Sequence, residues 1–213
     1  MPNHVRSMVT LYGTIEELSV IKKMLAWPAP IQWAKGEHEF LHFNFHSIIT
    51  PDKELWEEYN GPQPTTVSIE ESLKFASNHW YDWNIRNWDT KWNAYNTSVD
   101  NNFDDEVVDG IYRLVYHFDT AWSPPEAVIY ALGNKLNEMG LKVTFDWWFE
   151  EEQGWGGEIH YDGESTEIVG QWDIPDSHSE YEDRYGECMC FDTGEQIFDD
   201  CPLMDNDEEK KEE

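Results

Sequence analysis

The chain has 213 residues, enough for one good-sized domain or two small ones, and its 12 tryptophans indicate a packed interior. It carries 44 acidic and 14 basic side chains, for a formal net charge of −30 at pH 7. A chain this acidic repels phosphate, which argues against direct binding to nucleic acid or docking on an anionic membrane.

The N-terminal part predicts a strand followed by a helix. Apolar and polar residues partly alternate over Val5–Tyr12, which indicates a strand. Thr14 is a suitable N-cap for a helix that runs to about Ala26, where two prolines follow.

Phe40–Ile49 predicts a second strand with a buried and a wetter face. The wetter face would carry His42, Asn44 and His46. Histidines four apart on a strand lie about 13 Å apart, so they are not expected to share a metal ion.

The densest run of aromatic residues lies between His79 and Tyr95, where a helix starting near Ser68 is expected to continue. Rings three and four residues apart would form one stripe on a helix, serving either as a core seam or as a recognition surface. Because the run contains no reactive group, we favour the core seam. The residues assigned to the structural core are Trp80, Trp83, Trp88, Trp92 and Trp122.

The middle of the chain predicts a short strand over Asn93–Val99, an acidic loop over 100–110 and a strand over Ile111–Phe118. A helix is expected next, with Ser123 as N-cap, Pro124 in its first position and a glycine at its end.

The last third predicts a hairpin and one further strand. Leu141–Glu150 and Trp155–Tyr161 would pair, and Ser165–Trp172 would extend the sheet. Beyond Ile174 the segments are short and acidic, and the final residues read as a solvated tail.

This element order predicts an α+β fold of ferredoxin-like topology, a mainly antiparallel sheet with helices packed on one face. We expect a single domain over 1–172, made of a strand-helix-strand part over 1–66 and a Trp-rich ferredoxin-like part over 67–172. Residues 173–213 would form an acidic C-terminal extension.

Acidic residues are concentrated late in the chain. Between Val143 and Glu209 there are 22 Asp and Glu and one basic residue, Arg184. This field could serve solubility or a halophilic habit. Alternatively, ordered carboxylates could imitate nucleic acid and occupy a partner's basic groove, since complementary charge speeds association.

Several motifs carry a resemblance to a known family: Asn87–Ala94, Phe118–Pro125, the turn over Phe149–Gly157, and Gly13 after a strand. Together they resemble the YubB-like family of plasmid and phage proteins. The resemblance implies a ferredoxin-like domain in the C-terminal half and a mobile-element setting, but no established biochemical activity, and it supplies no catalytic residues to carry over. The chain departs from the family at Asp89, where Gly is usual, and at His4, where Trp is usual.

The sequence contains no phosphate-cradling, serine-hydrolase or zinc-protease motif, so we expect a protein that is not an enzyme and needs no cofactor. Cys188, Cys190 and Cys201 form at most a weak zinc candidate, and three reduced thiols are favoured. An odd number of cysteines, no secretion signal and no membrane span predict the cytoplasm of a host cell.

Together, these observations predict an acidic binding protein that inhibits a host nucleic-acid-handling defence system, such as restriction, CRISPR or a nuclease, through nucleic-acid mimicry. Its partner would be a basic nucleic-acid-binding host protein, without direct contact to nucleic acid. The alternatives are a small-ligand-binding protein or enzyme that uses the Trp cluster, and an accessory protein whose charge serves solubility only. The acidic surface expected to bind the partner comprises Asp100, Asp104, Asp105, Glu106, Asp109, Glu150, Glu151, Glu152, Glu158, Asp162, Glu164 and Glu167.

Overall fold

A computed structural model describes residues 3–30, 38–51, 80–100, 106–186, 197–198 and 201. The chain divides into two compact units. The first comprises Met1–Glu152 and Gly156–Gln171, and the second Gln153–Trp155 and Trp172–Glu213.

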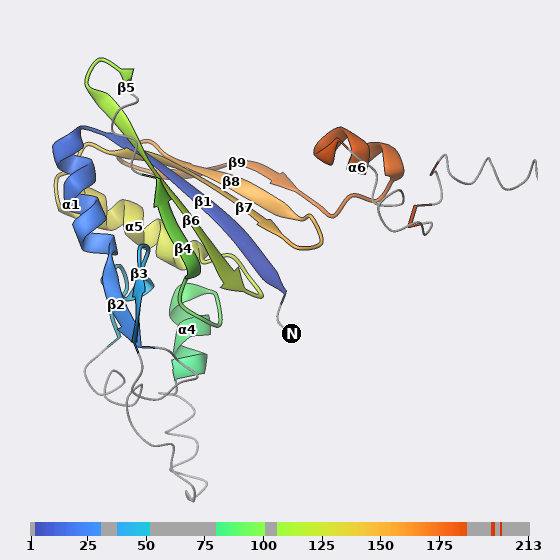
Figure 1. Ribbon diagram of the computed structural model, residues 1–213, viewed down its shortest axis with the longest axis horizontal. Coiled ribbons are helices and arrows are strands. Elements are labelled where there is room, and N and C mark those ends of the chain that lie inside the picture. Colours follow the sequence, from blue (N-terminus) through green and yellow to red (C-terminus); the bar gives the residue numbers. More distant parts are fainter. Residues whose placement is uncertain are drawn as a thin grey trace, which may run out of the picture. The chain divides into compact units, whose positions relative to one another are not determined.

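The first unit is built on one sheet with the strand order β4-β6-β1-β7-β8-β9, in which β5 also pairs with β6 (Figure 1). The central pairs, β1 with β6 and β1 with β7, are antiparallel. The strands are β1 His4–Gly13, β4 Tyr95–Asp100, β5 Glu106–Val108, β6 Ile111–Ala121, β7 Thr144–Glu151, β8 Gly156–Tyr161 and β9 Thr166–Trp172.

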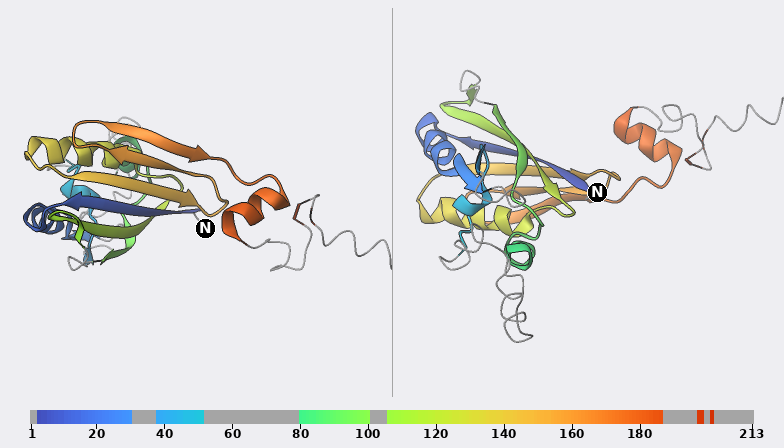
Figure 2. Two further views of the ribbon diagram at one scale, coloured as in Figure 1. Left: turned by 90° about the horizontal axis from the view of Figure 1, so that it is seen from above. Right: turned by 60° about the horizontal axis from the view of Figure 1, so that its bottom comes forward.

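Helices and a small ribbon cover one side of this sheet (Figures 1 and 2). The helices are α1 Ile15–Leu25, the short 3-10 turn η1 Phe45–Ser47, α4 Trp80–Trp88 and α5 Glu126–Glu138. Strands β2 Trp27–Pro30 and β3 His38–Leu41 pair to form the ribbon.

The core lies between the sheet and the helices, because each central strand buries alternate residues. On β1 these are Val5, Ser7, Val9 and Leu11, and on β7 they include Phe145 and Trp147. From the helices, α1 contributes Leu18, Ile21 and Leu25, and α5 contributes Val128, Ile129, Leu132 and Leu136.

Helix α1 starts with the expected N-cap, and its first turn also binds a residue far away in the sequence. The Thr14 hydroxyl accepts a hydrogen bond from Glu17 N, and the Glu17 carboxylate accepts from Thr14 N, which closes a capping box. Glu17 also accepts from Lys142 N at 2.8 Å, just before β7. Burial alone would raise the pKa of Glu17, but the hydrogen bonds from Lys142 and Thr14 outweigh it and lower that pKa.

The strand predicted over Phe40–Ile49 is wrong beyond Leu41. Asn44 caps the 3-10 turn η1 through a hydrogen bond from His46 N to its side-chain oxygen, so the chain bends instead of extending. Asn44 and His46, expected on a wetter face, are both buried. Aromatic residues lie on both sides of this turn, and their spacing in the sequence resembles the alternation of a strand.

Two other expectations also need correction. Helix α5 begins at Glu126, because the Ser123 hydroxyl binds Asp89 O and does not cap the helix. Helix α4 ends at Trp88, so Trp92 lies in the following turn. The predicted helix start near Ser68 lies outside the described residues.

The second unit contains the helix α6, His178–Tyr185, where the sequence had indicated only short acidic segments. Its N-cap Ser177 accepts from Glu180 N, and Gly186 ends it in the left-handed conformation with φ 80°. Arg184 donates to the main-chain oxygens of Gly154 and Asp173.

Candidate functional site

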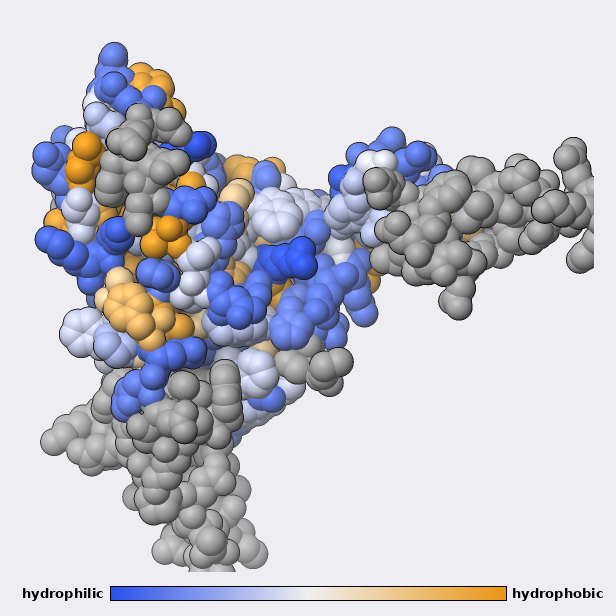
Figure 3. Space-filling view, viewed as in Figure 1, coloured by the Kyte–Doolittle hydropathy of each residue, from blue (hydrophilic) through white to orange (hydrophobic). Residues whose placement is uncertain are grey.

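Within the first unit, the helices α1, α4 and α5 leave one side of the sheet uncovered (Figures 1 and 2). The β1 residues Arg6 and Met8 point to this side, because they alternate with buried Val5, Ser7 and Val9. We call this side the open face. In the view of Figure 3, hydrophilic residues cover most of the visible surface of the described residues, and hydrophobic residues form small separate patches.

Strand register fixes the neighbours on the open face. Met8 lies between His117 of β6 and Trp148 of β7. One row further along β1, Arg6 lies between Asp119 and Glu150, so a guanidinium is flanked by two carboxylates. A hollow of about 420 Å³ opens here; its lining residues include Arg6, Ser7, Met8, Asn96, His117, Phe118, Asp119 and Trp148.

Acidic side chains outnumber basic ones on the strands of the open face. The carboxylates are Asp100, Asp119, Asp146, Glu150 and Glu158, and the guanidinium groups are Arg6 and Arg113. The apolar centre at Met8 and Trp148 therefore has an acidic border.

Three of these carboxylates contact neighbouring polar side chains. His160 Nδ1 lies 2.7 Å from Asp146 Oδ1, and His117 Nε2 lies 3.8 Å from Asp100 Oδ2. Asn96 donates to Asp119 Oδ2 at 2.8 Å. These contacts favour particular orientations of the three carboxylates on the strands of the open face.

The predicted acidic surface divides among several places. Asp100, Glu150 and Glu158 lie on the open face. Glu152 follows β7 and continues its alternation on the side of the open face, where its Oε1 lies 4.0 Å from His4 Nε2. The other described members are Glu106 and Asp109 at the β5–β6 hairpin, Asp162 and Glu164 at the β8–β9 turn, and Glu167 in β9. Asp104 and Asp105 lie outside the described residues.

Glu151 is a correction, because it is only 3% exposed and cannot belong to an acidic surface. It follows Phe145, Trp147 and Phe149 in the alternation of β7 and points to the core side. The same alternation could have identified Asp146 of β7 and Asp119 of β6, which the sequence prediction missed.

Asp162 has a local structural role. Its Oδ1 accepts from Glu164 N and Ser165 N, both at 2.8 Å, which closes the β8–β9 turn. These hydrogen bonds lower the pKa of Asp162.

A second cluster forms where the segments Asn87–Ala94 and Phe118–Pro125 meet. The Thr90 hydroxyl donates to Ala121 O at 2.9 Å, and Lys91 N lies 3.5 Å from the same oxygen. The Asp89 carboxylate accepts from Ala127 N at 2.8 Å and so caps α5. Asp89 has a φ of 61°, so the tight turn at this position is present although the residue is not glycine.

Aromatic rings surround the ammonium of Lys91 in this cluster. Its Nζ lies 4.4 Å from the ring centroid of Trp122, 4.9 Å from that of Trp92 and 5.8 Å from that of Tyr81. Such contacts stabilise a cation by about 0.5–1 kcal/mol at exposed sites. Lys91 thus joins the turn after α4 to the end of β6.

The tryptophans assigned to the core differ in burial. Trp88 is fully buried, and its indole N–H donates to Ile49 O at 3.3 Å. Trp80, Trp83 and Trp92 are half-buried. Trp122 is 43% exposed and has a φ of 77°, so its assignment to the core is wrong.

Among the described residues, no group of three or more His, Cys, Asp or Glu is arranged to hold a metal ion. Cys201 is buried, and Cys188 and Cys190 lie outside the described residues. None of the described helices is long and apolar enough to cross a membrane.

Comparison with known proteins gives a fold assignment for the second half of the chain. Residues 87–185 match the family model described as "Ferredoxin-like domain in Api92-like protein". Residues 87–185 carry a ferredoxin-like domain. This confirms the ferredoxin-like part of the fold prediction, and the matched range includes β4, β6, α5 and β7.

One solved structure is similar, the crystal structure of a protein api92 from Yersinia pseudotuberculosis. It has 7% sequence identity and a TM-score of 0.45, and the match covers 81% of this chain and 100% of that one. No curated protein matches the chain.

Proposed function

We propose that the chain is an acidic binding protein whose open face docks on the basic groove of a nucleic-acid-binding protein. The observation that carries this proposal is the pattern on the open face, where carboxylates border an apolar centre formed by Met8 and Trp148. Aromatic and Met side chains at the centre of a patch, with a polar rim, are typical of protein interfaces.

The charge of the whole molecule supports a basic partner. A net charge of −30 speeds encounter with a positively charged surface and opposes encounter with nucleic acid. Occupying such a groove would exclude the nucleic acid that normally binds there. The protein would thus act as a nucleic-acid mimic that inhibits its partner.

The setting we propose is a phage or plasmid protein acting on a host defence system, such as restriction, CRISPR or a nuclease. The resemblance of Asn87–Ala94 and Phe118–Pro125 to the YubB-like family supports this setting. The partner's basic groove would be a surface of a cytoplasmic host enzyme.

The test begins with affinity capture from host lysate, followed by titration of the captured basic protein with the chain. If the chain is a mimic, double-stranded DNA competes with it, and affinity falls steeply with added salt. Simultaneous binding of DNA and the chain, or an affinity unchanged at half-molar salt, would contradict the proposal.

Matched variants locate the interface. The triple variant Asp100→Asn, Asp146→Asn, Glu158→Gln removes three exposed carboxylates from the open face. The control Glu16→Gln, Glu138→Gln, Glu164→Gln removes three exposed carboxylates elsewhere. We expect the first variant to weaken binding by about tenfold or more at low salt and the control to change it by about twofold or less. Equal losses in both variants would show that the carboxylates act only through the overall charge of the protein. The open face would then not be the interface.

A further inference from the structure

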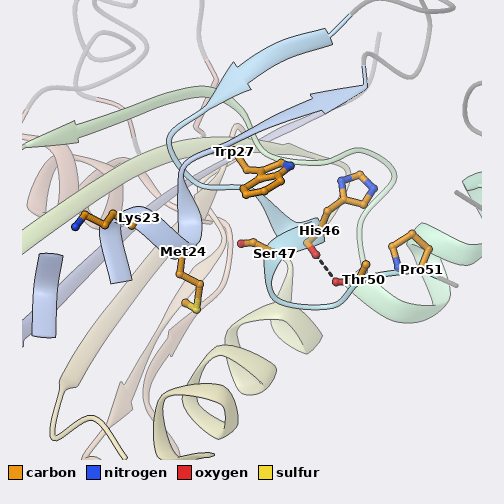
Figure 4. Close-up of a pocket in the computed structure, with 7 residues that line it drawn as sticks. All are labelled: Lys23, Met24, Trp27, His46, Ser47, Thr50 and Pro51. Atoms are coloured by element: carbon orange, nitrogen blue, oxygen red, sulfur yellow. Dashed lines mark hydrogen bonds between the residues drawn. The ribbon is translucent and has the colours of Figure 1, made fainter. Parts of the chain in front are cut away.

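A pocket of about 680 Å³ lies beside the end of α1, the start of β2 and η1, on the helix side of the sheet. Its lining residues include Lys23, Met24, Trp27, His46, Ser47, Thr50 and Pro51 (Figure 4). Pockets that hold small molecules have volumes of roughly 300–1,000 Å³ and mostly apolar walls with a few fixed polar groups. This pocket fits that description and is separate from the open face.

The wall at η1 is held by buried hydrogen bonds. Asn93 Oδ1 accepts from Phe45 N and from Ala94 N, both at 2.9 Å. Its Nδ2 donates to Asn44 Oδ1, which also accepts from His46 N. These bonds all lie within the protein, so the wall is organised before binding.

The same bonds fix the form of His46. Since Asn93 Oδ1 accepts from two N–H groups, Asn93 Nδ2 is the donor to His46 Nδ1 at 3.0 Å. The proton of the imidazole therefore lies on Nε2. Burial lowers the pKa of His46 to about 3, so this part of the wall is uncharged at neutral pH.

Two hydroxyl groups in the wall present acceptors. The Ser47 hydroxyl donates its proton to Asn44 O at 2.7 Å, and the Thr50 hydroxyl donates to His46 O at 2.6 Å. Each oxygen keeps its lone pairs for a ligand donor. Figure 4 shows the Ser47 hydroxyl directed toward the space beside Trp27 and Met24.

The other described lining residues are Lys23 and three apolar side chains, Met24, Trp27 and Pro51, of which Trp27 has a large flat ring. Trp27 is 58% exposed, and Figure 4 shows its indole ring between Met24 and His46. In the same view the Lys23 ammonium points away from the other lining side chains. None of the described lining side chains directs a charge into the pocket, so a charged ligand would lose hydration without compensation from them, whereas a flat neutral ring can stack on Trp27.

We propose that this pocket binds a neutral, planar aromatic molecule that carries one N–H or O–H donor. The ring stacks on Trp27 and contacts Met24, and the donor binds the Ser47 hydroxyl oxygen.

Three probes of nearly equal shape test the proposal: indole, 1-methylindole, which has no donor, and indole-3-acetate, which is anionic. Binding is followed by NMR through the methyl signal of Met24, assigned with Met24→Leu, during titration of the full chain. We expect indole to shift this signal and to bind about two- to tenfold more tightly than 1-methylindole, the usual effect of one neutral hydrogen bond. Indole-3-acetate should bind more weakly than indole.

Variants separate binding from stability. Ser47→Ala should abolish the preference for indole over 1-methylindole, a readout that a general loss of stability would leave unchanged. Trp27→Ala should weaken all binding, whereas Phe40→Ala should not, since Phe40 is equally exposed on the same ribbon but does not line the pocket. An unshifted Met24 signal with indole, equal affinities for indole and 1-methylindole, or tighter binding of indole-3-acetate would overturn the proposal.

Discussion

At the scale of single residues, His46 is a buried imidazole whose neutral form the fold requires. It is 5% exposed, and its ring lies 4.7 Å from that of Trp88 in an edge-on contact. Burial lowers its pKa from 6.5 to about 3. The unfolded chain therefore takes up a proton near pH 6.5, which the folded chain does not take up until about pH 3.

This difference predicts the sign of a pH effect. Between pH 6.5 and 3 the unfolded state binds more protons, so the free energy of unfolding falls as the pH falls, by up to about 1.4 kcal/mol per pH unit. We expect wild type to lose about 2 kcal/mol more than His46→Gln between pH 7 and pH 5, measured by urea unfolding. Gln can still accept from Asn93 but does not titrate. Equal losses in both proteins would show that His46 is not responsible.

Positive φ values mark the contact between the two motif segments. Asp89 and Trp122, with φ values of 61° and 77°, both lie where Asn87–Ala94 meets Phe118–Pro125. A bulky side chain at positive φ costs energy, which its surroundings must offset. Here the backbone hydrogen bond from Trp122 N to Asn3 O and the Lys91–Trp122 contact hold the conformation.

At the scale of elements, the packing of α5 on the sheet depends on Gly133. A Cβ atom at this position would lie 2.9 Å and 3.0 Å from two ring carbons of Tyr161 in β8. Tyr161 cannot easily move, because it is buried, stacks on Phe145 and donates its hydroxyl proton to Gly163 O.

We therefore expect Gly133→Ala to destabilise the protein by about 1–3 kcal/mol, the usual cost of overpacking a core. In an exposed helix position the same change stabilises by about 1 kcal/mol. The control is Asn134→Ala, the next residue in α5, which is exposed and should be neutral or slightly stabilising. Urea unfolding measures both variants, and a Gly133→Ala protein as stable as wild type would contradict this account of the packing.

Elements with a local signal could be predicted from the sequence. The alternation in Val5–Tyr12 and the capping residues Thr14 and Glu17 depend only on neighbouring residues, and the structure contains both features. The start of α5 depends on Asp89, a residue far away in the sequence, so local capping rules placed it too early. The turn at η1 likewise depends on Asn93, whose side chain binds the main chain of Phe45.

The candidate sites were harder to predict than the strands. Counting carboxylates included buried Glu151 and missed Asp119 and Asp146, because only strand register shows which side chains share a face. The pocket beside Trp27 could not be predicted, since it joins α1, β2 and η1 through contacts that leave no periodic pattern.

At the scale of the whole molecule, the two sides of the sheet differ in the residues that they present. The helix side contains the core and the apolar pocket, whereas the open face presents carboxylates around Met8 and Trp148. An antiparallel sheet with one covered face permits this division, since successive residues of each strand point to opposite sides. The proposed protein partner and the proposed small ligand would therefore bind without overlapping.

The net charge of −30 also predicts how salt changes stability. Like charges repel more strongly in the compact state than in the unfolded chain, and salt screens them, with a Debye length of about 30 Å at 0.01 M and 8 Å at 0.15 M. We expect the unfolding temperature to rise by a few degrees, corresponding to about 1 kcal/mol, between about 0.01 and 0.15 M salt. Screening depends on ionic strength alone, so NaCl and KCl should give equal shifts in thermal unfolding followed by circular dichroism. A rise that needs molar salt and occurs only with K⁺ would indicate a halophilic protein, and an unchanged unfolding temperature would show that repulsion does not limit the stability of the fold.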